Sequence, residues 1–566
     1  MKTVTFLFLF IASLTINAQI IHVPGDYPTV QQGINAALAG DTVIVAEGIY
    51  YEQISFLGKP ITVASNYILD ANPVHVTNTI LDGCLLPNDS SSVVLYTSGE
   101  DTTSILNGFT IRNGKGTLAT DSLLIYAGGI LVRNSGAKII NNHITHNIID
   151  ATQPNRNAFG AAISTPWEST EEWIVILNNT IDSNKCISGS LDALGAAIIS
   201  CYNTRMMNNI IINNSSISGG SSGHAYANVL GKSLLTPPDN WFIAENNIIK
   251  NNLASCSSNI VRGSGLLCAY THSRITGNDI SNNEIETTYQ GTYFGGAGIY
   301  IEYPLTTIIR GNTVNNNISS GYGGGLNVLE SSSSGMMIIE NNTYLSNSSE
   351  MGGGAIHFIG NTDNEIPVIQ SNKFISNQSI KGGAISGQTS GFLFQNNTFH
   401  LNEASNSHGG AIYLLKSGNS GNCIMINNGF SENSASQSGG AIYSFGYNLE
   451  LLNNILWQDN ASMGAEISID PGILSMAYNN IDISKVEGNA LIMDGNIFED
   501  PQFCDTVCLK PESDSPCLDH GTDLYVFSDT LTAPLYDILG QPRPLNNGFD
   551  MGAYEVLIVG THNHKT

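Results

Sequence analysis

The sequence predicts an all-β chain wound into a right-handed parallel β-helix, which is a solenoid of stacked coils. Only 12% of its 566 residues are Asp, Glu, Lys or Arg, whereas 58 Gly and 64 Asn make up more than a fifth of the chain. Gly and Asn disfavour helix interiors and suit turns, and the 42% of apolar residues are enough for a core. Two repeated motifs then predict the coils.

The first motif reads x-N-x-φ-x-x-N, where φ is apolar, and it recurs ten times at intervals of 25 to 38 residues. Because stacked coils place each Asn over the next one, we expect their amides to form hydrogen-bonded ladders. Weaker copies follow at Asn454 and Asn480. The first Asn of each copy is Asn142, Asn179, Asn209, Asn247, Asn278, Asn312, Asn342, Asn372, Asn397 or Asn428, and the second is Asn147, Asn184, Asn214, Asn252, Asn283, Asn317, Asn347, Asn377, Asn402 or Asn433.

The second motif is a stripe of three small residues followed by an aliphatic one, as in Gly353–Ile356 and Gly439–Ile442. Only the coil near Ala225 lacks a clean copy. Small residues let the backbone turn within a narrow interior, and each coil adds about 4.8 Å of length. Such coils are stabilised mainly by their neighbours. A β-propeller is the alternative, but its blades need about 40 to 50 residues.

Apolar residues just before the asparagine motif share one inward register. They are Ile139, Ile176, Met206, Ile309, Ile339, Ile369, Phe394, Met425 and Leu451.

The N-terminus predicts export. Lys2 precedes the apolar run Val4–Ile16, which is too short to span a bilayer, and Ala18 is a small residue suited to a cleavage site. We therefore expect a signal peptide over residues 1–18 and a secreted or surface-held mature protein. No later apolar stretch is long enough for a transmembrane helix.

A short helix is expected to cap the first coil. Thr29 and Gln32 form a capping box, and Gly40 ends the helix before a strand over 42–46. One face of this helix carries Val30, Ile34, Ala37 and Leu38.

Charge and cysteine content add two expectations. A net charge of −26 repels phosphate backbones, so nucleic acid is not expected as a partner. Because export permits disulfides, we expect Cys517 to pair with Cys504 or Cys508, which lie close in sequence.

Several parts of the chain then resemble three known groups of proteins. D-Y-P-T-V-Q-Q-G-I-N-A-A-L-A-G-D-T-V-I-V-A-E-G-I-Y at 26–50, I-L-D-G at 80–83 and N-G-F-T-I-R-N-G at 107–114 resemble the start of the pectin-lyase-like right-handed β-helix superfamily. The G-G-A-I and F-x-x-N pairs between 353 and 442 resemble the repeats of chlamydial polymorphic outer-membrane proteins. The segment 499–555 resembles the choice-of-anchor domain, type Q, of exported β-helix proteins.

These resemblances imply fold and export rather than one activity, because the superfamily contains lyases, hydrolases, epimerases and non-enzymes. The expected organisation ends in a capping or anchor domain and a tail. Its parts are the signal peptide (1–18), the N-terminal cap with the first coils (19–125), the repeats (126–495), the C-terminal domain (496–556) and a polar tail (557–566).

Evidence for an active site is slight. A uronate lyase needs a base and a cation, often calcium, and Arg205 and Arg274 occupy equal positions two coils apart, with His272 beside the second. An ordinary solvated face is the favoured explanation for their positions. Asp363 lies in N-T-D-N, a sequence similar to one polygalacturonase motif, but no second carboxylate faces it for inverting hydrolysis. No calcium-binding G-G-x-G-x-D array occurs, so no cofactor is expected; only the lyase alternative would use calcium.

A binding face has more support. The two long coils carry insertions at 165–173 and 236–241, and aromatic residues gather there and on neighbouring coils. Aromatic rings stack on the apolar faces of sugars, so we expect a glycan-contacting strip. The alternative is that these rings cover the edge of the core. The candidates are Trp167, Trp173, Tyr202, Trp241, Tyr270 and Tyr303.

The leading interpretation is an exported, surface-associated, adhesin-like β-helix protein that binds glycans or another surface, as a monomer. The first alternative is a polysaccharide lyase or related enzyme acting on uronic polysaccharides. The second is a structural spacer.

Overall fold

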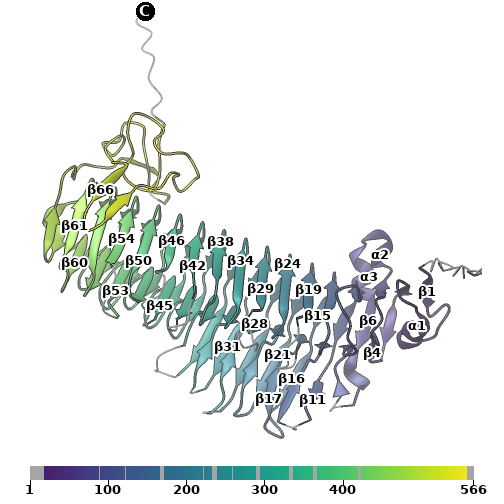
Figure 1. Cartoon of the computed structure of the whole chain (residues 1–566). Helices are drawn as coiled ribbons and strands as arrows, with labels where there is room; N and C mark the ends of the chain where they lie inside the picture. The colour runs from purple at the N-terminus through teal and green to yellow at the C-terminus, as the bar shows by residue number, and fades with distance from the viewer. Residues whose placement is uncertain are drawn as a thin grey trace, which may run out of the picture.

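The structure, a computed structural model, is a parallel β-helix, as the sequence predicts (Figure 1). The coils stack along one axis from the N-terminal to the C-terminal end, and strands of successive coils pair in parallel. The described residues are 18–87, 90–120, 123–165, 171–220, 222–232, 239–257, 259–288, 294–330, 335–360, 366–417, 422–505 and 507–557. Most of the predicted signal peptide therefore lies outside them.

Five sheets run along the solenoid and are named by their strand counts. The 17-stranded sheet runs from β1 (Ile20–Val23) to β63 (Ala490–Ile492), the 14-stranded sheet from β3 (Gly48–Tyr50) to β59 (Ile455–Trp457), and the 15-stranded sheet from β4 (Ile54–Ser55) to β62 (Val486–Glu487). The ten-stranded sheet runs from β16 (Ile148–Ala151) to β56 (Ser434–Ala435), and the seven-stranded sheet from β7 (Ser90–Ser91) to β32 (Val261–Arg262). The seven-stranded sheet widens the earlier coils only.

One coil shows how the sequence turns the chain. After its first strand Asn208 adopts φ 53°, and after its second strand Asn213 adopts φ 57°, both in the left-handed region that Asn tolerates. The residue with left-handed backbone is therefore the one before each ladder Asn. The strands of this coil are β24 (Asn203–Met207), β25 (Ile210–Ile212), β26 (Ser215–Ser218), β27 (Ala225–Tyr226) and β28 (Val229–Lys232).

Both predicted asparagine ladders are present. In each step the backbone N–H and the side-chain Nδ2 of one Asn donate to the Oδ1 of the Asn in the next coil, as Asn342 does to Asn372 at 2.9 and 3.0 Å. The first ladder runs from Asn142 through Asn454 and continues on Asn479 rather than on the predicted Asn480. Asn480 instead donates to the Glu499 carbonyl and to Cys517 Sγ, because it faces the C-terminal segment.

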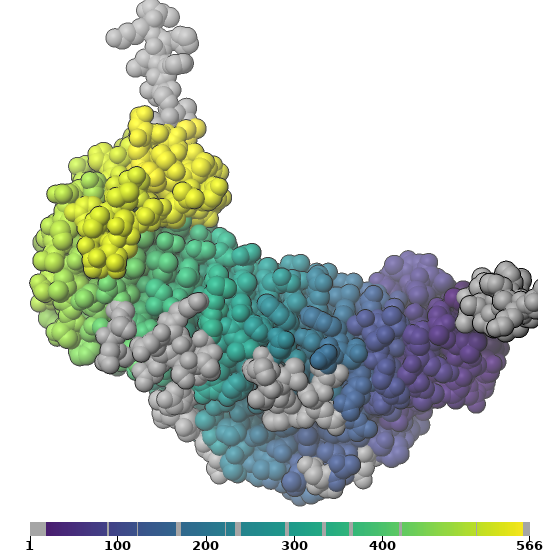
Figure 2. Space-filling model, in the orientation of Figure 1, coloured from purple at the N-terminus to yellow at the C-terminus, as the bar shows by residue number. Residues whose placement is uncertain are grey.

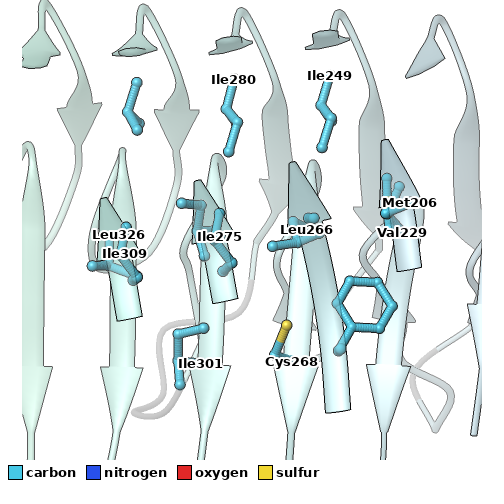
Figure 3. Close-up of a cluster of buried hydrophobic side chains, with 14 of the residues drawn as sticks. Met206, Val229, Ile249, Leu266, Cys268, Ile275, Ile280, Ile301, Ile309 and Leu326 are labelled. Carbon is cyan, nitrogen blue, oxygen red and sulfur yellow. The ribbon is translucent and has the colours of Figure 1, made fainter. Parts of the chain in front are cut away.

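The interior is a continuous apolar column. Met206, Ile275 and Ile309 lie in the predicted inward register, and Figure 3 shows them beside the side chains of the facing sheets. On the inner side of the 14-stranded sheet four rings stack in successive coils, with centroids 5.1, 4.7 and 4.6 Å apart. These rings are Tyr344, Phe374, Phe399 and Phe430.

The N-terminal cap is helix α1 (Val30–Ala36), which packs on β1, β2 (Thr42–Val45) and β4. The Thr29 side chain accepts a hydrogen bond from the Gln32 backbone N–H at 3.2 Å, as the capping box predicts. Leu38 is a correction: it is 63% exposed, because the helix ends two residues before it. Two further helices, α2 (Tyr67–Asp70) and α3 (Pro73–Asn78), follow β5 (Thr62–Ser65).

The C-terminal module, residues 499–557, lies beside the last coils rather than over their end (Figures 1 and 2). It docks on turns between the 17- and 14-stranded sheets: Asn427 Nδ2 donates to the carbonyls of Asp550 and Gly552, and Asn453 Nδ2 donates to that of Thr522. The expected capping role is therefore replaced by lateral packing. The described strands of the module are β64 (Phe503–Asp505), β65 (Lys510–Pro511), β66 (Leu524–Val526) and β67 (Thr530–Thr532).

The predicted disulfide is not formed. None of the nine cysteines, all of which lie in the described part of the chain, is bonded to another. Cys517 is fully buried against Ile455 and Met551 and its sulfur accepts from Asn480 at 3.1 Å, whereas Cys504 is exposed. The two sulfurs belong to opposite environments, so proximity in sequence does not bring them together.

The second ladder ends on an acid. Asp459 takes the place of the next Asn, and its Oδ1 accepts from Asn433 N and Nδ2 at 2.7 and 2.8 Å. Its Oδ2 and the Oε2 of Glu466 are both buried, and the two carboxyl groups lie next to each other, close enough to share a hydrogen bond when one of them is protonated. Burial, and then the adjacent Glu466, raise the pKa of Asp459 well above its usual range, and burial raises the pKa of Glu466 despite nearby Lys485.

Asp459→Asn is therefore expected to stabilise the protein at alkaline pH. Both carboxyl groups have higher pKa values in the folded than in the unfolded chain, so their contribution to stability is present at low pH and lost as the pH rises. At pH 8 we expect the variant to gain about 1–3 kcal/mol in the free energy of unfolding, and at pH 4 much less. Urea unfolding at both pH values measures this, with exposed Glu487→Gln as the control. An equal effect of Asp459→Asn at both pH values would contradict it.

Candidate functional site

The candidate site lies on the outer face of the 17-stranded sheet, on four successive strands. These are β19 (Trp173–Leu177), β24, β29 (Trp241–Glu245) and β34 (His272–Thr276). In β19 burial alternates, so that Ile174 and Ile176 face the core and Trp173 faces outward, half-buried.

One row across these strands carries the aromatic side chains. Trp173 pairs with Asn203, and Trp241 pairs with His272. The Trp241 backbone N–H donates to Asn203 Oδ1 at 2.9 Å, which links the two pairs. Trp173, Asn203, Trp241 and His272 thus form one line over four coils, called the tryptophan row below. The structure confirms the prediction that Trp173 and Trp241 lie in one register.

His272 supports Trp241. The two rings stack with centroids 5.0 Å apart and planes 20° apart. His272 Nε2 lies 3.9 Å from Asp239 Oδ1, and its Nδ1 is buried and has no hydrogen-bond partner within the described ranges. The imidazole therefore holds the indole in place against the sheet.

The two arginines considered as catalytic candidates lie next to the row and share one carboxylate. Arg205 Nη2 is 3.1 Å from Glu245 Oε2, and Arg274 Nε is 3.3 Å from Glu245 Oε1. The arginine side chains are 45% and 44% exposed, whereas Glu245 is 17% exposed. Two guanidinium groups on one carboxylate leave a net positive charge and several outward N–H donors. The group can bind hydroxyl or acidic groups, but guanidinium does not supply a base.

The tyrosines do not extend the tryptophan row. Tyr202 is only 2% exposed, and its hydroxyl accepts from the Asn134 backbone N–H at 3.0 Å, so its assignment to a glycan-contacting strip is wrong. Tyr270 is 39% exposed and packs against Tyr303, with centroids 5.0 Å apart. Among the described residues no ring contact joins this pair to the tryptophan row. Trp167 and Asp363 lie outside the described residues.

A second charged cluster is structural. Arg262, at the end of the seven-stranded sheet, contacts Glu302 of the 15-stranded sheet at 3.0 Å and lies over the Tyr226 ring at 5.5 Å. Burial raises the pKa of Tyr226 to about 12, so its hydroxyl stays protonated. These groups pair with one another and join the two sheets.

A further set of five rings is not predicted from the sequence; four of them are half-buried and one, His357, is buried. They lie on the outer face of the 15-stranded sheet and in the turn before it, and each stacks on a neighbour. The signal that could have found them is their position, because three of them directly follow the aliphatic residue of the small-residue stripe. The set comprises Tyr322, His357, His408, Tyr413 and Tyr443.

Few other features of the described residues point to a function. In the described ranges no group of three or more His, Cys, Asp or Glu side chains is arranged to hold a metal ion. No described helix has the length and apolar character needed to cross a membrane. No model of a known protein family matches the chain, and no curated protein matches it.

Proposed function

We propose that this chain is an exported β-helix protein that binds an extended glycan chain along the tryptophan row. The observation that carries the proposal is the placement of Trp173 and Trp241 in one register, half-exposed, beside exposed Arg205 and Arg274. Rings supply the apolar platforms for sugar faces, and guanidinium groups supply donors for hydroxyl or acidic groups.

The spacing favours a chain over a single sugar. The two indoles are two coils apart, which is about 9–10 Å at the strand spacing of a β-sheet. Each ring is expected to contribute about 1 kcal/mol, so several sugar units must be bound together for useful affinity. The row runs along the solenoid axis, in line with an extended ligand.

The lyase alternative has less support. The two arginines that might act on a uronate both contact Glu245, and neither guanidinium is a base at neutral pH. A lyase would release unsaturated product from a uronic polysaccharide, and its absorbance tests this alternative directly.

Trp173→Ala combined with Trp241→Ala is expected to weaken glycan binding by roughly 25-fold, from about 5-fold for each lost ring. A glycan array identifies a retained polysaccharide, and affinity electrophoresis on it measures the change. The control is Tyr51→Ala, which removes an exposed ring far from the row. Unchanged binding by a folded double variant would refute the proposal, and a lower unfolding temperature with unchanged binding would show that the rings only cover the core.

A further inference from the structure

A row of side chains on the outer face of the 15-stranded sheet contains a gap. His357 in β45 (Ile356–Ile359) pairs with Ser386, which pairs with Tyr413 in β53 (Ile412–Leu415), which pairs with Tyr443 in β57 (Ile442–Phe445). Tyr413 and Tyr443 stack with centroids 5.4 Å apart and planes 13° apart. Ser386, in β49 (Ile385–Gln388), is the one member without a ring.

The Lys381 side chain lies over this gap. Its Nζ is 5.2 Å from the centroid of the Tyr413 ring and 6.0 Å from that of Tyr322, both within the range of cation–π attraction. Tyr322 in turn stacks on His357, with centroids 4.2 Å apart.

Two small residues make room for the lysine stem. A Cβ placed on Gly352 would lie 3.2 Å from Lys381 Cε and 3.2 Å from Ser386 Oγ. A side chain at position 352 would therefore press on the stem, and Gly352 leaves space for it.

The charge on Lys381 has no acidic counterpart among the residues that the structure describes. In the part of the chain that the structure describes, no carboxylate lies within ion-pair distance of its Nζ. By contrast, Lys250 lies 2.6 Å from Asp279, and Lys485 lies 3.5 Å from Glu466. Burial lowers the pKa of Lys381, because the ammonium is partly removed from water without a counter-charge.

The neighbouring groups add donors and no opposing charge. Burial lowers the pKa of His357 to about 3 and lowers that of His408, so both imidazoles are neutral at pH 7. Burial raises the pKa of Tyr322 and of Tyr413, so both phenols keep their O–H donors. Among the described residues, the ammonium is therefore the one formal charge next to Tyr322 and Tyr413. Asp470 acts on Tyr443, one coil further along, and the whole chain carries −26.

We propose that Lys381, Tyr322 and Tyr413 form a second binding site, specific for an acidic sugar. The ammonium pairs with the acidic group of the sugar, and the two tyrosines contact its ring and hydroxyls. This site is on a different sheet from the tryptophan row and does not depend on it.

Isothermal titration with tetragalacturonate and with maltotetraose tests the proposal, in the wild type and in the Trp173→Ala/Trp241→Ala background. We expect tetragalacturonate to bind at least tenfold more tightly than maltotetraose in both backgrounds. In the Trp173→Ala/Trp241→Ala background, where the row no longer binds, Lys381→Met should remove this preference, Lys381→Arg should keep it, and Tyr413→Ala should weaken tetragalacturonate binding. Lys381→Met keeps an unbranched apolar side chain in place of the methylene groups of the lysine. An unchanged unfolding temperature would confirm that the variant folds as the wild type does.

Several results would overturn the proposal. The wild type could bind the two tetrasaccharides equally or bind neither, or the preference could be unchanged when Lys381→Met is added to the Trp173→Ala/Trp241→Ala background. Full affinity in Tyr413→Ala, with displacement by sodium sulfate alone, would indicate an anion site without sugar recognition and would also overturn the proposal. Acid preference that persists when both tryptophans are removed distinguishes this site from the tryptophan row. If the preference disappears with the tryptophans, the second site fails while the proposed function stands.

Discussion

Asn342→Leu is expected to lower the free energy of unfolding by about 2–6 kcal/mol, because it leaves two buried donors without their acceptor at about 1–3 kcal/mol each. Asn342 is 1% exposed, and its Oδ1 accepts from both the backbone N–H and the Nδ2 of Asn312 at 2.9 Å. Its own Nδ2 donates to the Ile309 carbonyl at 2.9 Å. Urea unfolding followed by circular dichroism measures the loss.

The matched control is the preceding residue. Asn341 is exposed and has φ 56°, so Asn341→Gly keeps the turn and should change stability little. If Asn342→Leu unfolds at the same urea concentration as the wild type, the ladder does not stabilise the coils.

Arg543→Met is expected to cost about 3–5 kcal/mol within the C-terminal module, because it leaves a fully buried carboxylate unpaired. Arg543 and Glu555 both have side chains that are 0% exposed, and Nη1 lies 2.6 Å from Oε1. The second guanidinium nitrogen donates to Asn396 Oδ1 at 3.0 Å, so Arg543 also joins the module to the coils. Limited proteolysis should then cut within residues 499–557 and leave the coils intact.

A surface ion pair serves as the control for this change. Lys250 pairs with Asp279, and their side chains are 32% and 41% exposed. Lys250→Met should cost no more than about 1 kcal/mol. Equal protease resistance of Arg543→Met and wild type would show that the buried pair does not hold the module together.

The repeats could be predicted because one residue type serves one geometric purpose in every coil. An Asn such as Asn342 must form hydrogen bonds with the Asn of the coil before it and with the Asn of the coil after it. The same residue type therefore recurs once per coil, and this recurrence is visible in the sequence. The inward register of Met206 and Ile309 follows from strand alternation alone. The tryptophan row follows from the same counting, since Trp173 and Trp241 lie in strands.

The features that were predicted wrongly or missed also have physical causes. Tyr202 lies in the turn between β23 (Ile198–Ser200) and β24. Inward and outward side chains alternate only within a strand, so a residue's position in the sequence does not predict where its side chain points in a turn. The seven-stranded sheet is built from pieces as short as β22 (Ala193–Leu194), which are too brief to show a period. The Lys381 site joins side chains from separate coils, and only the register of the sheet brings them together.

Tryptophan fluorescence tests glycan binding by the tryptophan row most directly. The chain has four Trp, so Trp167→Phe with Trp457→Phe leaves emission from Trp173 and Trp241 alone. Titration with oligosaccharides of a polysaccharide that the protein retains should give a saturable change in emission, at lower concentrations as the oligosaccharide lengthens. Retention of that polysaccharide without any change in emission would contradict binding at the row.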